Sequence, residues 1–222
     1  RVFVHSPGGL VASSVISALE QAITDVRAKR AGVPINVLLG KAVRKSVPVY
    51  ANINRGARDR SPDGVAQSAR SAVASGFNAV KIAPFDGAYY ADVNKRDFKS
   101  RTKAGIERVY AIREAVGADI ELFVDANCNL DLYHAAKLTE MMKPHGLSFF
   151  EEPLTQNDVA GMAQLRRATG VALACGQNEG LSFRFRDLLM KEAIDYAQPN
   201  VLISGGFTQC AKIAGMAQAF NV

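Results

Sequence analysis

The sequence predicts an α/β protein built as a TIM-type (β/α) barrel, in which parallel strands alternate with helices. Short apolar runs alternate strictly with helical segments along most of the 222 residues. Three of the runs end in Asp125, Glu151 and Gln177, which follow one another at intervals of 26 residues. One strand and one helix together take about 25–30 residues in an eight-unit barrel of about 250 residues. The chain is therefore long enough for most of such a barrel.

The first expected element is an amphipathic helix over residues 13–31, which ends at Gly32-Val33-Pro34. Its apolar residues fall on one stripe, as helical periodicity requires. The stripe consists of Val15, Ile16, Leu19, Ile23 and Val26.

Six further segments read as strands, because β-branched or aromatic residues cluster in them and a turn signal follows. These strands are predicted at residues 47–52, 79–84, 120–125, 147–151, 171–175 and 196–199. Helices are predicted at residues 62–75, 101–116, 131–143, 157–168, 182–192 and 207–219. Phe220-Asn221-Val222 reads as the start of a seventh strand, so a closed barrel needs one or two strands more.

A doubly wound sheet is the main alternative fold for strict β/α alternation. It would carry a G-x-G-x-x-G turn after the first strand, and the sequence has none there. Gly205-Gly206, before the last helix, could bind an anion at the helix N-terminus, or could serve only to permit a tight turn.

Composition excludes several classes of protein. The chain is 48% hydrophobic, but no apolar run approaches the ~20 residues needed to span a bilayer, and no secretory signal is visible. Its three cysteines form no C-x-x-C pair, which argues against a disulfide framework or zinc site and favours the cytoplasm. The net charge of +6 comes from scattered basic residues, so we expect an anionic small substrate and no nucleic-acid or membrane partner. We also expect a homo-oligomer.

Oxygen-bearing side chains at the ends of three successive parallel strands would converge on one point. Mg²⁺ prefers such ligands, and a carboxylate at the C-terminal end of a barrel strand is typical of an active site. The alternative is that each residue only caps the helix that follows it.

Five short motifs follow one another along the chain, and four of them lie at or directly after the ends of predicted strands. They are Val124-Asp125-Ala126-Asn127, Phe150-Glu151-Glu152-Pro153, Gly176-Gln177-Asn178, Gln198-Pro199-Asn200 and Ser204-Gly205-Gly206. With them, nearly the whole chain resembles the enolase superfamily, in particular the mandelate racemase and muconate lactonizing enzyme group. The resemblance implies a linker helix and remnant of an N-terminal capping domain at residues 1–45. It implies a barrel domain at residues 46–222 that lacks the last strand or strands.

The resemblance also implies a Mg²⁺-dependent lyase of the acid-sugar dehydratase type. Such an enzyme abstracts the proton α to a carboxylate through a metal-stabilised enolate, because a fixed cation offsets the developing charge. The metal ligands would be Asp125, Glu151 and Gln177, with Glu179 as a near-equal alternative for the third. We place Asn52, Asn127 and Glu152 at the substrate and assign catalytic roles to Lys81 and Asn200.

The sequence departs from the family pattern at several of these positions. Gln177 stands where the family usually has an acid, and Asn200 stands where its racemases have Asp. Ala83 stands where the second lysine of Lys-x-Lys would act as a base, so Lys81 would serve as a fixed positive charge or only as a structural ion-pair partner. The base could lie beyond Val222. A racemase or epimerase, or a non-catalytic metal- or ligand-binding barrel, remain the competing functions.

Overall fold

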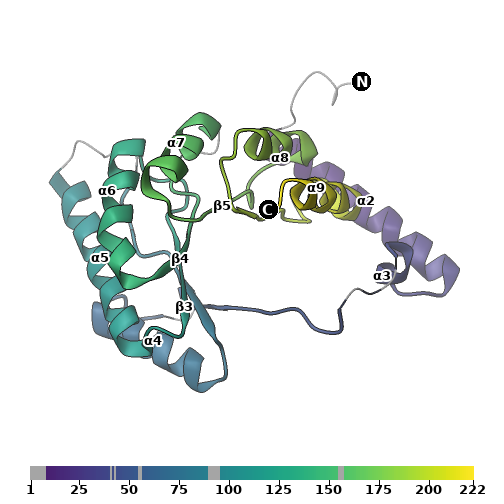
Figure 1. The fold of residues 1–222 in the computed structure, drawn as a ribbon. Coiled ribbons are helices and arrows are strands. Elements are labelled where there is room, and N and C mark those ends of the chain that lie inside the picture. Colours follow the sequence, from purple (N-terminus) through teal and green to yellow (C-terminus); the bar gives the residue numbers. More distant parts are fainter. Residues whose placement is uncertain (1–8, 41, 43, 55–56, 90–95, 155–157) are drawn as a thin grey trace. The chain divides into compact units, whose positions relative to one another are not determined.

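The structure, a computed structural model, describes residues 9–40, 42, 44–54, 57–89, 96–154 and 158–222 (Figure 1). The chain divides into two compact units. The larger unit comprises Val49–Cys175 and Lys191–Tyr196, and the smaller comprises Arg1–Pro48, Gly176–Met190 and Ala197–Val222. Within the described ranges, no helix has both the length and the apolar character that a membrane span needs.

A sheet forms the centre of the larger unit. Its strands are β1 (Ala51–Asn52), β2 (Ala79–Ile82), β3 (Glu121–Asp125), β4 (Leu147–Glu151), β5 (Leu173–Cys175) and β6 (Tyr196–Ala197), and they follow one another in chain order. The pairs from β1 to β5 are all parallel. This order confirms the barrel-type prediction, because a doubly wound sheet reverses its strand order.

Strands β1 to β5 are connected by four α-helices, namely α4 (Pro62–Ala74), α5 (Arg96–Val116), α6 (Leu132–Met142) and α7 (Val159–Thr169). A short 3₁₀ turn, η2 (Lys143–His145), leads into β4. Three of the helices begin where a side-chain oxygen accepts a backbone N–H: Ser61 for α4, Asp131 for α6 and Asp158 for α7. Figure 1 shows α4 to α7 alongside β3 and β4, as expected for helices that cover the outer face of a barrel wall.

The two faces of the sheet differ, because successive side chains on a strand point in opposite directions. Leu122, Val124 and Phe150 belong to one face and are fully buried. The other face carries an apolar cluster of Ala79, Phe123, Phe149 and Ala174, with Ala172 packed against it. Lys81, Asp125 and Glu151 have the same parity as this cluster on their strands, so they lie on its face, toward the strand ends.

Two of the predicted strands differ from the structure: one is shorter than predicted, and the other does not form. The first strand was expected over residues 47–52, but β1 contains only Ala51 and Asn52, and Val47 and Val49 are exposed. Phe220–Val222 does not begin a strand. Asn221 has φ +60°, and the Val222 N–H donates to the Ala217 carbonyl at 2.9 Å, which closes the end of the preceding helix.

The smaller unit contains α2 (Leu10–Ala31), α3 (Ile35–Leu38), α8 (Leu181–Met190) and α9 (Gly206–Ala219). Helix α2 contacts α9. The buried residues of α2 are small or polar, namely Ser13, Ser17, Thr24 and Ala28. The predicted apolar stripe lies elsewhere on the helix, since Val15, Leu19, Ile23 and Val26 are each more than half exposed. The helix was predicted correctly, but its apolar stripe is not its packing face within the described chain.

Polar contacts fix α2 on the start of α9. The Glu20 carboxylate accepts from the Phe207 N–H at 2.8 Å, the Thr208 N–H at 3.1 Å and the Thr208 hydroxyl at 2.6 Å. A Cβ on Gly206 would lie 2.1 Å from Glu20 Oε2, so glycine is needed for this approach. Of the two roles left open for Gly205-Gly206, an anion site or only a tight turn, the structure shows a carboxylate of the chain itself, Glu20, at this helix N-terminus.

Candidate active site at the strand ends

Lys81, Asp125 and Glu151 form one buried ionic cluster at the C-terminal ends of β2, β3 and β4. Asp125 and Glu151 are direct partners in the parallel register of β3 and β4. Lys81 Nζ donates to both Glu151 oxygens, at 2.9 and 2.7 Å, and lies 3.4 Å from Asp125 Oδ2. All three residues are no more than 5% exposed. Two buried carboxylates therefore share one ammonium group.

The pKa directions follow from this arrangement. Burial raises the pKa of Asp125 to about 6, and the neighbouring charge of Glu151 adds to the effect, while Lys81 works against it. Burial lowers the pKa of Lys81, but its hydrogen bond to Glu151 and the charges of Glu151 and Asp125 outweigh this, so the net shift is upward. The cluster therefore has more negative charge than Lys81 alone can neutralise.

The backbone beyond β3 and β4 is strained beside this cluster. Asn127, Cys128 and Glu152 have φ values of +50°, +59° and +39°, in the region that side-chain-bearing residues rarely adopt. The Cys128 N–H donates to the Glu152 carbonyl at 2.7 Å, which joins the two strained turns. Backbone strain of this kind clusters at functional sites. Asn127 and Glu152, which we placed at the substrate, both lie in these turns.

The capping alternative fails for Asp125 and Glu151. Asp125 Oδ1 accepts the Asn127 N–H at 2.8 Å, which closes a turn directly after the strand and caps no helix. Helices α6 and α7 are capped instead by Asp131 and Asp158. The two strand-end carboxylates are therefore available for another role.

Two neighbours of the cluster, Cys128 and Tyr50, were not among the predicted site residues. Cys128 Sγ donates to Glu152 Oε2 at 3.3 Å, and burial, reinforced by Glu152, raises the pKa of its thiol. The ring of Tyr50 packs edge-on against Phe123, and Lys81 Nζ lies 5.4 Å from its centroid. Tyr50 adds a weak cation–π contact to Lys81. Cys128 directly follows the Asp125 motif, and this position was the one available signal for it.

The remaining predicted site residues lie at the ends of other strands. Asn52 Oδ1 accepts the Asn54 N–H at 3.2 Å, directly after β1. Asn200, in the smaller unit, closes a turn, since its Oδ1 accepts the Leu202 N–H at 3.0 Å and its own N–H donates to Ser204 Oγ at 3.2 Å. Neither contact occupies the amide nitrogen of the Asn side chain.

Gln177 and Glu179 also belong to the smaller unit. Strand β5 ends at Cys175 and Gln177 lies in a turn, so the strand does not extend to Glu179 as its role as a ligand would require. Glu179 is 4% exposed and accepts from Arg184 Nε at 2.7 Å and Nη2 at 3.3 Å. An arginine therefore already pairs with the Glu179 carboxylate.

The donor set at β3 and β4 suits a divalent cation. Mg²⁺ is bound by one or two carboxylates together with substrate and water oxygens. Asp125 and Glu151 supply two adjacent carboxylates, and burial together with the charge of Glu151 raises the pKa of Asp125. Across the described ranges, no group of three His, Cys, Asp or Glu side chains meets metal-binding geometry.

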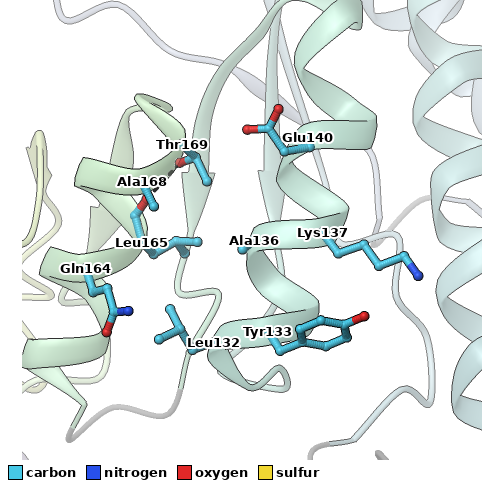
Figure 2. A pocket seen from close by; sticks show the side chains of 9 residues that line it. All are labelled: Leu132, Tyr133, Ala136, Lys137, Glu140, Gln164, Leu165, Ala168 and Thr169. Atoms are coloured by element: carbon cyan, nitrogen blue, oxygen red, sulfur yellow. Dashed lines mark hydrogen bonds between the residues drawn. The ribbon is translucent and has the colours of Figure 1, made fainter.

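A separate hollow lies between α6 and α7 (Figure 2). It has a volume of about 470 Å³, and its lining includes Leu132, Tyr133, Ala136 and Leu165. None of the predicted site residues lines it, so it lies apart from the charged cluster.

Comparison with known proteins agrees with this geometry. Residues 64–222 match the family model described as enolase C-terminal domain-like. The chain is 30% identical over 210 residues to a D-gluconate dehydratase of Thermoproteus tenax and 31% identical over 215 residues to a D-galactonate dehydratase of Xanthomonas euvesicatoria. The crystal structure of the 3,6-anhydro-D-galactonate cycloisomerase from Zobellia galactanivorans superposes with a TM-score of 0.83 at 28% identity.

The matches cover nearly all of this chain but a much smaller share of each relative. They cover 95%, 97% and 100% of this chain, but only 41%, 54% and 57% of the respective relatives. The chain thus spans about half the length of the relatives that it matches. The family model covers well over half of the chain, and the parallel sheet with acidic residues at its strand ends agrees with it. The chain therefore belongs to the enolase C-terminal domain-like family of the enolase superfamily.

Proposed function

We propose that this chain carries the catalytic strand ends of a Mg²⁺-dependent acid-sugar dehydratase. The observation that carries the proposal is the cluster in which Lys81 bridges Asp125 and Glu151 within a family whose relatives include D-gluconate and D-galactonate dehydratases. The substrate would be a small sugar acid, and the scattered excess of basic residues is compatible with an anion. A cytoplasmic location and a homo-oligomer belong to the same proposal, as does a domain boundary near residue 45.

The reaction removes the proton α to the substrate carboxylate and a hydroxyl group from the β carbon. Water leaves, and the resulting enol rearranges to a 2-keto acid. Asp125 and Glu151 would hold Mg²⁺, with Gln177 as a neutral third ligand. When bound, Mg²⁺ supplies positive charge at the substrate carboxylate.

Lys81 would act as a second fixed cation. Its Nζ lies between two carboxylates and donates to both Glu151 oxygens, so it is held as an ammonium group and is poorly placed to accept a proton. A preorganised charge stabilises the negative charge that develops as the α-proton leaves. Asn127 and Glu152, held in the strained turns, would contact the substrate, together with Asn52. Asn200 would donate a hydrogen bond to the substrate from its side-chain amide nitrogen.

The test is incubation of the full chain with Mg²⁺ and a panel of sugar acids that includes D-gluconate and D-galactonate. NMR should show a 2-keto product that disappears when EDTA is added and when Asp125 is changed to Ala. The exposed Asp25, which pairs with Lys29 on α2, provides a matched control as Asp25→Ala. An epimeric product of unchanged mass would favour the racemase or epimerase alternative, and Mg²⁺ binding without turnover of any acid would favour a non-catalytic barrel.

A further inference from the structure

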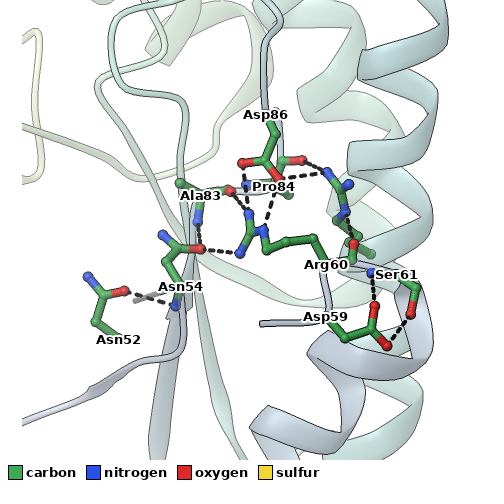
Figure 3. A network of polar contacts seen from close by, with 9 residues as sticks. Asn52, Asn54, Asp59, Arg60, Ser61, Ala83, Pro84 and Asp86 are labelled. Carbon is green, nitrogen blue, oxygen red and sulfur yellow. Dashed lines mark hydrogen bonds and ion pairs between the residues drawn. The ribbon is translucent and has the colours of Figure 1, made fainter. Parts of the chain in front are cut away.

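The C-terminal end of β2 is held by side chains where its pairing with β1 stops (Figure 3). The backbone bond from the Ile53 N–H to the Lys81 carbonyl, at 3.0 Å, continues the β1–β2 ladder past Asn52. Directly after β2, the Ala83 N–H donates to Asn54 Oδ1 at 2.9 Å, and the Ala83 carbonyl accepts from Arg60 Nη2 at 2.7 Å. Side chains therefore satisfy both backbone groups of Ala83.

Arg60 is itself fixed by four acceptor atoms on three residues, of which the Ala83 carbonyl is one. Its Nε and Nη2 donate to the two oxygens of Asp86, each at 2.9 Å, in the paired geometry that gives strong and directional bonds. Its Nη1 donates to Asn54 Oδ1 at 3.0 Å, so Asn54 links Arg60 to the Ala83 N–H. Figure 3 shows these side chains converging on the end of β2. The network leaves the guanidinium little freedom to move.

Helix α5 anchors the network through Arg108. Its Nε donates to the Arg60 carbonyl at 2.6 Å, its Nη1 donates to the Pro84 carbonyl at 2.5 Å, and Nη1 lies 3.3 Å from Asp86 Oδ2. The side chain is 15% exposed. The segment after β1, the segment after β2 and α5 are thus connected at one point.

This point lies next to the ionic cluster. Ile82 is the register partner of Val124, so Ala83 lies level with Asp125, and Lys81 lies two residues below Ala83 on the same strand. Lys81 must reach across β3 to bind Glu151 on β4 at 2.7 Å. On its β1 side, the last part of β2 is held by Asn54 and Arg60. A shift of about 1 Å in this strand would break the contacts of Lys81, and misplacement of that size can cost up to about 10²-fold in rate.

We propose that Arg60 is a positioning residue that fixes the end of β2 and thereby holds the Lys81 ammonium at Glu151. This inference rests on the proposed function, in which Lys81 stabilises the charge that develops on the substrate. Arg60 touches neither substrate nor metal in this role.

The first test compares Arg60→Ala and Arg60→Lys in the full chain with Mg²⁺ and the accepted sugar acid. Arg60→Ala should lower kcat about tenfold with KM changed less than twofold, since substrate binding is retained while transition-state stabilisation is lost. Lysine keeps the charge but has three N–H donors on a single nitrogen, whereas the guanidinium of Arg60 reaches four acceptor atoms. The kcat of Arg60→Lys should therefore lie between those of the wild type and Arg60→Ala. Arg70, which donates to Gln67 on the surface of α4, gives the matched control Arg70→Ala, with unchanged kcat.

The decisive test is a double-mutant cycle with Lys81→Met, measured where circular dichroism shows every variant fully folded. If Arg60 acts through Lys81, adding Arg60→Ala to Lys81→Met should lower kcat less than twofold. An equal loss of about tenfold in both backgrounds would overturn the proposal, because a general structural effect of Arg60 would not depend on Lys81.

A crystal structure of Arg60→Ala tests the same inference without activity. Movement of Lys81 Nζ beyond about 3.5 Å from the Glu151 carboxylate, the limit of a hydrogen bond, would support positioning. Retention of the wild-type distance would overturn it. If the wild-type chain turns over no sugar acid, the proposed function fails, and this measurement still decides the role of Arg60.

Discussion

Two acidic residues, one in each unit, differ in the groups that bind their carboxylates. Glu151 in the larger unit is 1% exposed and is bound by a lysine side chain that it shares with Asp125. Glu20 in the smaller unit is bound by the backbone N–H groups and the hydroxyl at the start of α9. The first arrangement gathers charged side chains at strand ends, while the second joins two helices.

The pKa directions show what this difference means. Burial and a neighbouring carboxylate raise the pKa of Asp125 beside Glu151 to about 6. For Glu20, burial acts upward, but hydrogen bonds from Thr208, Phe207 and Thr24 outweigh it and lower the pKa. A carboxylate held by several hydrogen bonds at the start of a helix is a structural link, whereas two neighbouring buried carboxylates repel each other and favour a nearby cation.

Removal of Glu151 should have the largest effect. Glu151→Ala should abolish Mg²⁺ binding by calorimetry and lower the free energy of unfolding by about 3–5 kcal/mol, because Lys81 stays buried without its main partner. Urea unfolding measures the second effect. The double variant Lys81→Met/Glu151→Ala should regain part of this stability, since it removes the unpaired ammonium. Full Mg²⁺ affinity in Glu151→Ala would show that the metal site is misassigned.

Loss of Lys81 should affect turnover more than metal binding. Removing one group that stabilises developing charge costs about 3–4 kcal/mol in the barrier. Lys81→Met should therefore lower kcat about 10²–10³-fold while calorimetry still detects Mg²⁺. Lys81→Arg should recover part of the activity if charge alone matters. Unchanged turnover in Lys81→Met would leave Lys81 as a purely structural ion-pair partner.

Substitution of Gln177 and of Glu179, the two candidates for the third metal ligand, should change the Mg²⁺ affinity to different extents. Gln177→Glu adds a negative ligand and should tighten Mg²⁺ binding by about tenfold, because affinity depends on the number of charged ligands. Glu179→Gln should change it little, since Arg184 binds that carboxylate. Calorimetry on both variants decides the matter, and the reverse ranking would assign the ligand role to Glu179.

Glu20 should show the smallest effect and a different dependence on pH. Glu20→Gln should cost about 1 kcal/mol in the free energy of unfolding, as for loss of a helix cap. The folded-state pKa lies below the ordinary value of 4.5, so the stabilisation is present above pH 4.5 and is lost as the pH falls through the folded pKa. Urea unfolding from pH 7 to 3 should show the two proteins converging in acid. A difference independent of pH would exclude an ionised Glu20.

The sequence by itself predicted the order of the elements and placed Lys81, Asp125 and Glu151 toward the ends of three successive strands. The 26-residue interval places Asp125 and Glu151 at equivalent positions of successive βα units. Parallel pairing of the two strands then makes them neighbours. Strand and helix positions were also predictable, because hydrophobic periodicity reports local conformation. The exceptions are β1, where only two residues pair, and Phe220–Val222, which closes a helix.

Tertiary structure alone decided which partner each of these side chains meets. The apolar stripe of α2 gave no sign that Ser13, Ser17 and Thr24 form its buried face, because the choice of face depends on α9. Glu20 and Thr208 are 188 residues apart, and Lys81 and Glu151 are 70 residues apart. Periodicity and local motifs carry no information about such contacts. They form because a buried charge must find a partner, and only the folded chain determines which partner is within reach.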